Sequence, residues 1–573
     1  MAAPHKQRRR VIVALILALV LAVVLPPFVN ANLFRARLAR SVSGALGRNV
    51  TMGDVKIRLL PLPGFQIENF VIGDDPAFSA EPMLRAESVT ARLRLTSLWR
   101  GKLEIARLSL SYPSLNLVRN ADGRWNIEGL LAHASQVSAA PTATKKPEAR
   151  PRFPYIEADS GRINFKVLQE KKAHVLVETD FALWQEAENQ WNMRLEGRPT
   201  RTDENLGDTG TLRMGGSFQR AGTLENTPIK LTFDWQKAQL GQLTALMYGR
   251  DRGWRADVRV NGELEGTPRQ FVAKASIQLN DFHRYDIATD DALRLTAECT
   301  ANHAIPSGAE AVGFRNHFTC RIPMSAGAIE VNSYGQYWWQ APQYLSVRAT
   351  GIPVADMAQI YRRAKRDVPK DITGSGMLNA YFSRITYPNS ASPRWIGQGA
   401  MTNVVLSSPS LAAEMRAESI HFGFNQVETS PEGPNAIALN PRLKQAKVSR
   451  TLSLPPENVF TVDPFQISVA DSKPLSVSGA NSGTGLHLDV KGENSTQQLM
   501  NCGHLLGLQT PAAATAAANA VIAVDLDIDA HWANFAAPIV SGVVKPTGRA
   551  ATTHTAQAAS NQQHAKTPKQ TRE

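Results

Sequence analysis

The chain has 573 residues, of which 43% are hydrophobic and 20% charged, and its formal net charge is +13. This length exceeds what one compact core supports, so we expect several domains or one long repetitive body. Residues 1–48 contain eight basic and no acidic residues, and residues 545–573 carry a net charge of +4, which leaves +1 for residues 49–544. The body therefore lacks the positive charge that binds phosphate backbones, and nucleic acid is not an expected partner.

The first predicted element is a transmembrane helix over residues 11–29, a run of 19 residues without charge. At 1.5 Å per residue it spans roughly 28 Å, close to the ~30 Å hydrocarbon core of a bilayer. Lys6 and Arg8–Arg10 precede it, which predicts a cytoplasmic N-terminus and an exported body. Because Val29-Asn30-Ala31 resembles a cleavage site, a removed signal peptide is the alternative to a retained anchor.

Residues 30–48 predict an amphipathic juxtamembrane helix. Its apolar side consists of Leu38, Val42, Ala45 and Leu46, and its arginines lie elsewhere on the helix. A basic amphipathic helix suits the surface of an anionic membrane.

From Val55 onward apolar and polar residues alternate with the period of two that is typical of strands. The clearest runs cover residues 89–96, 229–236, 254–260, 273–279 and 522–528. Helical periodicity is confined to short segments, of which Gln239–Tyr248 and Val354–Lys365 are the best candidates. Residues 132–153 contain almost no large apolar side chain and predict a linker, and the polar residues 545–573 predict a disordered tail.

Residues 49–131 carry a longer signature. It begins VTMGDVKIRLLPLPGFQIENFVIGDDPAFSAEPMLRAESV and continues TSLWRGKLEIARLSLSYPSLNLVRNADGRWNIEGLL. The proline-glycine turn, Ile72–Ser79, Glu81–Leu84 and Pro113–Asn126 resemble, in order, the N-terminal motifs of the AsmA family of envelope-biogenesis proteins. The resemblance implies an anchor in a Gram-negative inner membrane and a long periplasmic β-structure with an apolar groove. It also implies a role in moving phospholipid toward the outer membrane or in outer-membrane assembly.

We therefore expect a mainly β protein, with one N-terminal transmembrane helix and an elongated antiparallel body that is groove-like or sandwich-like and has few short helices. The expected parts are a cytoplasmic basic N-terminus (1–10), the transmembrane helix (11–29), the juxtamembrane helix (30–48), an AsmA-like N-terminal β domain (49–131), the linker (132–153), a periplasmic β-rich body (154–544) and the tail (545–573).

An apolar strand face can line a groove for lipid or pack as an ordinary sandwich core. Exposing an acyl chain of about fifteen methylenes to water costs on the order of 12 kcal/mol, which a continuous apolar face would remove. Alternation marks as lipid-facing candidates Val89, Leu93, Leu95, Leu103, Ile105, Leu231 and Phe233.

Catalytic motifs are missing: the sequence has no HExxH, GxSxG or P-loop, so we expect neither an enzyme nor a cofactor. Asp525, Asp527 and Asp529 alternate along one strand face and are expected to face solvent, although a calcium site is the alternative.

Cysteine spacing leaves three interpretations open. Cys299, His303, His317 and Cys320 have zinc-like spacing. In an oxidising periplasm a disulfide between Cys299 and Cys320 is favoured over two buried thiols and over a metal site. No bound metal is expected.

The sequence thus predicts a membrane-anchored periplasmic protein that binds or conducts phospholipid acyl chains. The alternative is a structural or regulatory factor that influences outer-membrane protein assembly by contact. Because the body is short for crossing the periplasm alone, either an envelope protein partner or a role confined to the inner-membrane side is also expected.

Overall fold

A computed structural model describes most of the body of the chain. The described residues are 35–58, 62–94, 105–120, 124–129, 154–167, 170–187, 189–219, 223–305, 316–335, 342–386, 393–424, 458–469, 473–507, 520–531 and 539–546, with the single positions 13, 32, 96 and 221. Apart from Val13, the predicted transmembrane helix lies outside these residues, and so does the tail from residue 547. Within the described ranges, no helix combines the length and the hydropathy that crossing a membrane requires.

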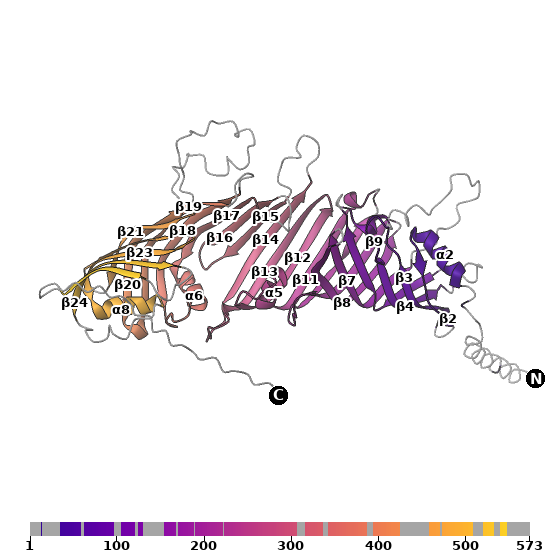
Figure 1. The fold of residues 1–573 in the computed structure, drawn as a ribbon, viewed down its shortest axis with the longest axis horizontal. Coiled ribbons are helices and arrows are strands. Elements are labelled where there is room, and N and C mark those ends of the chain that lie inside the picture. The colour runs from indigo at the N-terminus through magenta and orange to yellow at the C-terminus, as the bar shows by residue number, and fades with distance from the viewer. Residues whose placement is uncertain are drawn as a thin grey trace, which may run out of the picture. The chain divides into compact units, whose positions relative to one another are not determined.

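Contacts divide the chain into two compact units. The first comprises residues 1–282 and 294–307, and the second comprises residues 283–293 and 308–573. Both consist mainly of antiparallel strands with a few short helices (Figure 1), which confirms the predicted mainly β class.

The first unit has two helices, a 3-10 turn and fourteen strands in its described part. These are α2 (Arg35–Leu46), β1 (Val50–Thr51), β2 (Val55–Arg58), β3 (Gly64–Ile72), β4 (Leu84–Leu93), β5 (Ile105–Ser111), β6 (Ser114–Arg119), β7 (Tyr155–Val167), β8 (Glu170–Ala187), β9 (Gln190–Arg201), β10 (Thr211–Gln219), η3 (Leu224–Asn226), β11 (Ile229–Gln239), α5 (Leu240–Tyr248), β12 (Trp254–Thr267), β13 (Gln270–Arg284, whose last two residues fall in the second unit) and β14 (Arg294–Ala304).

Strands β7 to β12 pair with their chain neighbours in antiparallel fashion, as do β13 and β14. Strands β5 and β6 instead both pair in parallel with β7. This pairing brings residues 105–119 beside residues 155–167, on the far side of the predicted linker 132–153. The division into units therefore does not fall at that linker.

The N-terminal strands enclose a closed core with helix α2. Val89 of β4 is 2% exposed there and packs with buried residues of β1 to β5. Leu38, Val42 and Leu46 of α2 pack against the same core. We expected the apolar side of α2 to lie on a membrane surface. It packs against the sheet instead, because the strands offer the nearest apolar surface.

The second unit has two helices, a 3-10 turn and eleven strands in its described part. These are β15 (Asn316–Pro323), β16 (Ala328–Gly335), β17 (Tyr344–Pro353), α6 (Val354–Ala364), β18 (Thr373–Ile385), β19 (Arg394–Ser408), η5 (Pro409–Leu411), β20 (Ala413–Phe424), β21 (Phe460–Val469), β22 (Leu475–Asn481), β23 (Gly485–Ser495), α8 (Thr496–Leu505), β24 (Val521–His531) and β25 (Ile539–Pro546). From β15 to β25 each strand pairs antiparallel with the next.

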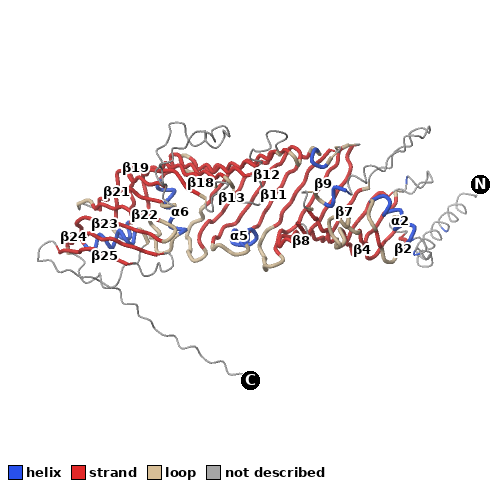
Figure 2. Tube along the Cα trace, turned by 45° about the horizontal axis from the view of Figure 1, so that its top comes forward, coloured by secondary structure: helices blue, strands red, loops and turns tan. Residues whose placement is uncertain are grey.

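Helices α5, α6 and α8 each connect two consecutive, paired strands. Figure 2 shows α5 at the ends of its strands. Helices α5 and α6 confirm the predicted helices. Helix α5 ends at Gly249, whose φ of 71° suits glycine and stops the helix. Helix α6 carries Asp356 in its first turn and Arg362 and Arg363 in its last, which complements the helix dipole. Helix α8 was not expected; the Ser495 side chain caps it by accepting a hydrogen bond from the Gln498 amide at 3.2 Å.

The burial of Val89 predicts a stability effect. Val89→Ala should lower the free energy of unfolding of the N-terminal core by about 2 kcal/mol, because the removed methyl groups leave a cavity in a closed core. Leu231→Ala, on a half-buried strand face, should cost about 1 kcal/mol or less. Hydrogen exchange of β3–β5 and of β11 at increasing urea would measure both. Unchanged protection of β3–β5 in Val89→Ala would contradict the core assignment.

Candidate functional site

The first unit carries a broad apolar face on β8 to β12. Residues directly opposite each other in an antiparallel pair share a face, so the register identifies the members. Two adjacent rows across the strands are Phe181, Leu195, Met214, Phe233 and Gly262, and Leu183, Met193, Gly216, Leu231 and Leu264. We call this surface the first apolar face.

The other side of the same strands is polar. One row there consists of Glu196, Arg213, Asp234 and Asn261, and Arg213 Nη2 lies 2.9 Å from Glu196 Oε1. One side of these five strands is therefore apolar, and the other side carries polar side chains that suit contact with solvent.

Most of the first apolar face is half-buried rather than buried. Phe233, Leu231 and Leu195 are partly exposed, and none of them belongs to a buried cluster of the described residues. Among the described residues, only one end of the face is closed, where Leu243 and Leu246 of α5 form a core with strand residues including Val258. An apolar sheet surface of this size, without a cover in the described part of the chain, indicates a binding surface.

Glycines shape this face by making room for large side chains. A Cβ atom at Gly262 would come within 2.6 Å of Phe233 Cζ, so the phenyl ring lies across the glycine. At Gly216 a Cβ would meet Leu231 Cδ2 at 2.8 Å. At both positions a backbone oxygen of the neighbouring strand lies closer still, at 2.2 Å for Lys274 and 2.1 Å for Lys230, so a Cβ would also force the strands apart.

The second unit repeats the arrangement on β16 to β21. One row is Val331, Val347, Phe382, Gly397, Phe424 and Phe460, and the next is Ile329, Ala349, Ala380, Gly399, Phe422 and Val462. We call this the second apolar face. Its other side again carries polar residues, such as Glu330, Arg348, Tyr381 and Gln398.

An aromatic cluster occupies one end of the second apolar face. Phe382, Trp395, Phe422, Phe424 and Phe460 have ring centroids 5.1–6.1 Å apart in the pairs that touch. All five rings are half-buried. Phe460 begins its strand and Trp395 is the second residue of its own, while Phe382 and Phe424 lie at or near the ends of theirs, so the cluster lies at the rim of the sheet.

Helices α6 and α8 cover the other end of this face. Val354 of α6 packs with Val404 and Ala417, and Leu505 of α8 packs with Ile372 and Ala413. Since α6 directly precedes β18, whose far end carries Phe382, the helix and the aromatic cluster lie at opposite ends of that strand.

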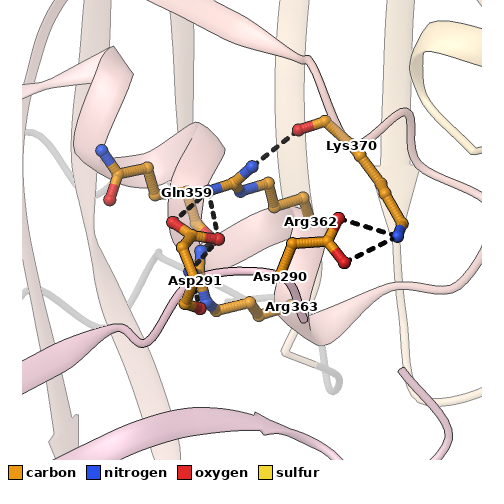
Figure 3. Close-up of polar contacts among 6 residues, drawn as sticks. All are labelled: Asp290, Asp291, Gln359, Arg362, Arg363 and Lys370. Carbon is orange, nitrogen blue, oxygen red and sulfur yellow. Dashed lines mark hydrogen bonds and ion pairs between the residues drawn. The ribbon is translucent and has the colours of Figure 1, made fainter. Parts of the chain in front are cut away.

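A buried arginine holds α6 in place (Figure 3). Arg363 is 1% exposed; its Nη2 lies 2.9 Å from Asp291 Oδ1 and donates to the Asp291 carbonyl oxygen at 2.8 Å. Its Nη1 donates to the Gln359 carbonyl oxygen at 3.1 Å. Arg362 donates to both carboxylate oxygens of Asp291, at 3.1 and 2.8 Å. The hydrogen bond from Arg363 is the main reason that the pKa of Asp291 is lowered.

A neighbouring ion pair is exposed on both sides. Lys370 Nζ lies 2.8 Å from Asp290 Oδ2, and both side chains are about 70% exposed, at 70% and 72%. In Figure 3 Asp291 lies between the two arginines, whereas Asp290 turns toward Lys370. The contact between Arg363 and Asp291 therefore joins a buried cation of α6 to the segment 283–293 of the same unit. The exposed pair of Lys370 and Asp290 adds little to stability.

The predicted lipid-facing residues fall in different places. Leu231 and Phe233 lie on the first apolar face. Val89 is in the closed core and is not available to a ligand, because α2 and the strands around it cover it. Leu93 pairs with the exposed Ile105 at the end of β4, and Leu95 and Leu103 lie outside the described residues. The prediction did not identify the second apolar face, although alternation in YFSRI and IHFGF signals it.

The zinc-like spacing does not form a site. His317 and Cys320 are three residues apart on β15, so their side chains leave opposite faces of the strand. His303 instead stacks on Phe271 at 4.9 Å, and His317 stacks on Tyr334 at 4.3 Å. Cys299 on β14 and Cys320 on β15 are both buried, and each is disulfide-bonded rather than a free thiol. Cys502 is a free thiol whose pKa burial raises to about 11.

The aspartates of β24 have a partner that the sequence did not indicate. His487 Nδ1 lies 2.9 Å from Asp529 Oδ1 and 3.5 Å from Asp527 Oδ1, and Lys491 pairs with Asp525 at 3.4 Å. The hydrogen bond to Asp529 is the main cause of the raised pKa of His487. The three carboxylate side chains are 46–65% exposed, so they face solvent as expected, and β23 places His487 and Lys491 opposite them.

Two antiparallel β units, each with one apolar side that helices cover at one end, define a β-rich protein built to present apolar strand faces. The sequence model of the AsmA family matches residues 4–181 of the chain, a segment that includes the motifs of residues 49–131. This match points to a function in the cell envelope. Comparison with curated proteins and with solved structures found no match.

The contact between Arg363 and Asp291 predicts a pH-dependent stability of α6. Asp291→Asn should increase hydrogen exchange in α6 at pH 7, because a buried guanidinium loses its counter-charge. The Asp291 pKa is lowered in the folded state, so this stabilisation is present above its ordinary value of 3.8 and is lost as the pH falls below it.

Asp290→Asn is the matched control and should leave α6 unchanged, since its partner is exposed. Equal protection of α6 in wild type and Asp291→Asn at pH 7 would contradict the role of this contact.

Proposed function

We propose that this protein is anchored in the inner membrane by residues 11–29 and that its periplasmic apolar faces bind or conduct phospholipid acyl chains. The observation that carries the proposal is the half-buried apolar surface of five adjacent strands in the first unit, with a polar reverse side. The anchor rests on the length and charge pattern of the N-terminal run, and the exported position of the body follows from it.

Free energy favours acyl chains as the ligand. Each methylene moved from water onto an apolar surface gains roughly 0.8 kcal/mol. Phe181, Met214, Leu231 and Phe233 present no hydrogen-bonding group, so these side chains cannot satisfy the polar groups of a sugar, a nucleotide or a peptide backbone. We accordingly propose a non-catalytic role without a cofactor, in which the strands shield the chains from water.

A contact role in outer-membrane protein assembly is the second candidate. Strand β25 favours it, since all eight of its residues are exposed and Ile539, Val540, Val543 and Val544 are apolar. Its described pairing is with β24 alone, and an exposed apolar edge strand suits the addition of a strand from another protein. An envelope protein partner would bind at this edge.

Lipid retention by the full-length protein tests the first proposal. Wild type should co-purify with phospholipid, and Phe233→Glu should retain at least tenfold less on the first unit, because a carboxylate on the face must lose water when chains cover it. Native mass spectrometry after detergent extraction would measure the lipid bound.

Ser217→Glu is the matched control: it adds the same carboxylate to β10 on the polar side, opposite Lys230. It shares the membrane anchor and should retain lipid as wild type does. Equal lipid in folded Phe233→Glu and Ser217→Glu would reject the first apolar face as the binding surface. No lipid in wild type would leave the contact role ahead.

A further inference from the structure

Arg384 is a charged residue on an otherwise apolar strand face. It lies on β18 directly opposite Leu345 on one side and Trp395 on the other, and two residues after Phe382. The register therefore places it on the second apolar face, beside the aromatic cluster at the rim. It is half-buried.

Arg384 has no ion pair or hydrogen bond within the part of the chain that the structure describes. The half-buried and buried arginines of α6, by contrast, both bind the carboxylate of Asp291. A guanidinium that is partly removed from water without a counter-charge is costly, and its five donors suit a planar or tetrahedral oxyanion. Charge complementarity thus points to an anionic group at this position.

The surroundings of Arg384 indicate what carries that anion. Trp395, Phe382 and Phe424 lie on the same face at the same strand ends, and aromatic rings are favoured where an apolar region meets a polar one. Farther along β18 the face continues through Ala380 to Leu378, which pairs with Met401 near the cluster under α6. Six residues of strand span about 20 Å. This is enough for an acyl chain, since one leaflet of the hydrocarbon core is about 15 Å deep.

We propose that Arg384 binds the phosphate of a phospholipid headgroup at the aromatic rim of the second apolar face, with the acyl chains directed along that face toward α6. This proposal rests on the proposed function and adds to it the position and the orientation of the ligand. The guanidinium fixes the polar end, and the strand surface accepts chains without fixing their length.

Arg394 provides a matched control. It carries the same charge on the adjacent strand and is also half-buried, but it lies opposite Ile385 and so belongs to the other side of the sheet. Arg384→Gln and Arg394→Gln therefore remove the same charge at the same strand ends, and only the first removes it from the apolar face.

The experiment compares two fluorescent probes with identical acyl chains, a phosphatidylglycerol and a diacylglycerol that lacks the phosphate. Binding is measured by anisotropy with the full-length protein in the Phe233→Glu background, so that the signal reports the second apolar face. Arg384→Gln should weaken phosphatidylglycerol at least tenfold, as expected for a lost charge-assisted hydrogen bond, and leave diacylglycerol unchanged. Arg394→Gln should alter neither, and millimolar inorganic phosphate should not displace the lipid.

Other results would overturn the assignment. Equal weakening of both probes by Arg384→Gln would show a structural role, and an unchanged phosphatidylglycerol affinity would show no role. Displacement by inorganic phosphate would identify a phosphate site that needs no lipid. If the parent protein binds both probes equally well, the acyl-chain function stands and the headgroup site fails; if it binds neither, both fail.

Discussion

An antiparallel strand places successive side chains on opposite faces, and a sheet keeps this alternation in phase only while the register holds. Here it holds over many strands in each unit, from Phe181 to Gly262 in the first and from Val331 to Phe460 in the second. All apolar residues of these rows consequently gather on one side. A surface of this kind must be covered by another element or by a ligand, and most other features of the protein relate to how it is covered.

The helices cover the apolar faces only in part. Lys237, with a φ of 57°, and Gly351, with a φ of 61°, mark register shifts just before α5 and α6. A bulge bends the strand end and lets the following helix turn onto the apolar side. Helix α5 has 9 residues and helix α6 has 11, which is too few to cover the whole apolar face of the neighbouring strands. They close one end of each face, and Arg363 fixes α6 there through Asp291. The N-terminal core differs, because α2 lies over a small group of short strands and buries Val89 completely.

Alternation in the sequence was sufficient to predict the β class, the runs at 229–236 and 273–279, and helices α5 and α6. It was not sufficient to distinguish Val89 from Leu231, since both are apolar residues in alternating strands. Whether such a residue is covered depends on an element elsewhere in the chain, as α2 shows for Val89. Arg384 could not be recognised either. Its significance comes from Leu345 and Trp395 on the neighbouring strands, and pairing between strands is a property of the fold rather than of a local pattern.

The chemistry of the faces also limits what they can select. The free energies of dispersion and of apolar burial grow with the contact area and do not depend on direction. A surface of Leu, Met, Phe and Gly therefore discriminates poorly between acyl chains of different length or saturation. It also offers few barriers to movement along the strands, because no hydrogen bond must be broken at each step. Directional contacts are found at the strand ends, where aromatic rings and a guanidinium meet solvent. If the faces bind amphiphiles as proposed, selectivity for one amphiphile over another comes from the rim, and the strand surface supplies affinity in proportion to the length of chain it covers.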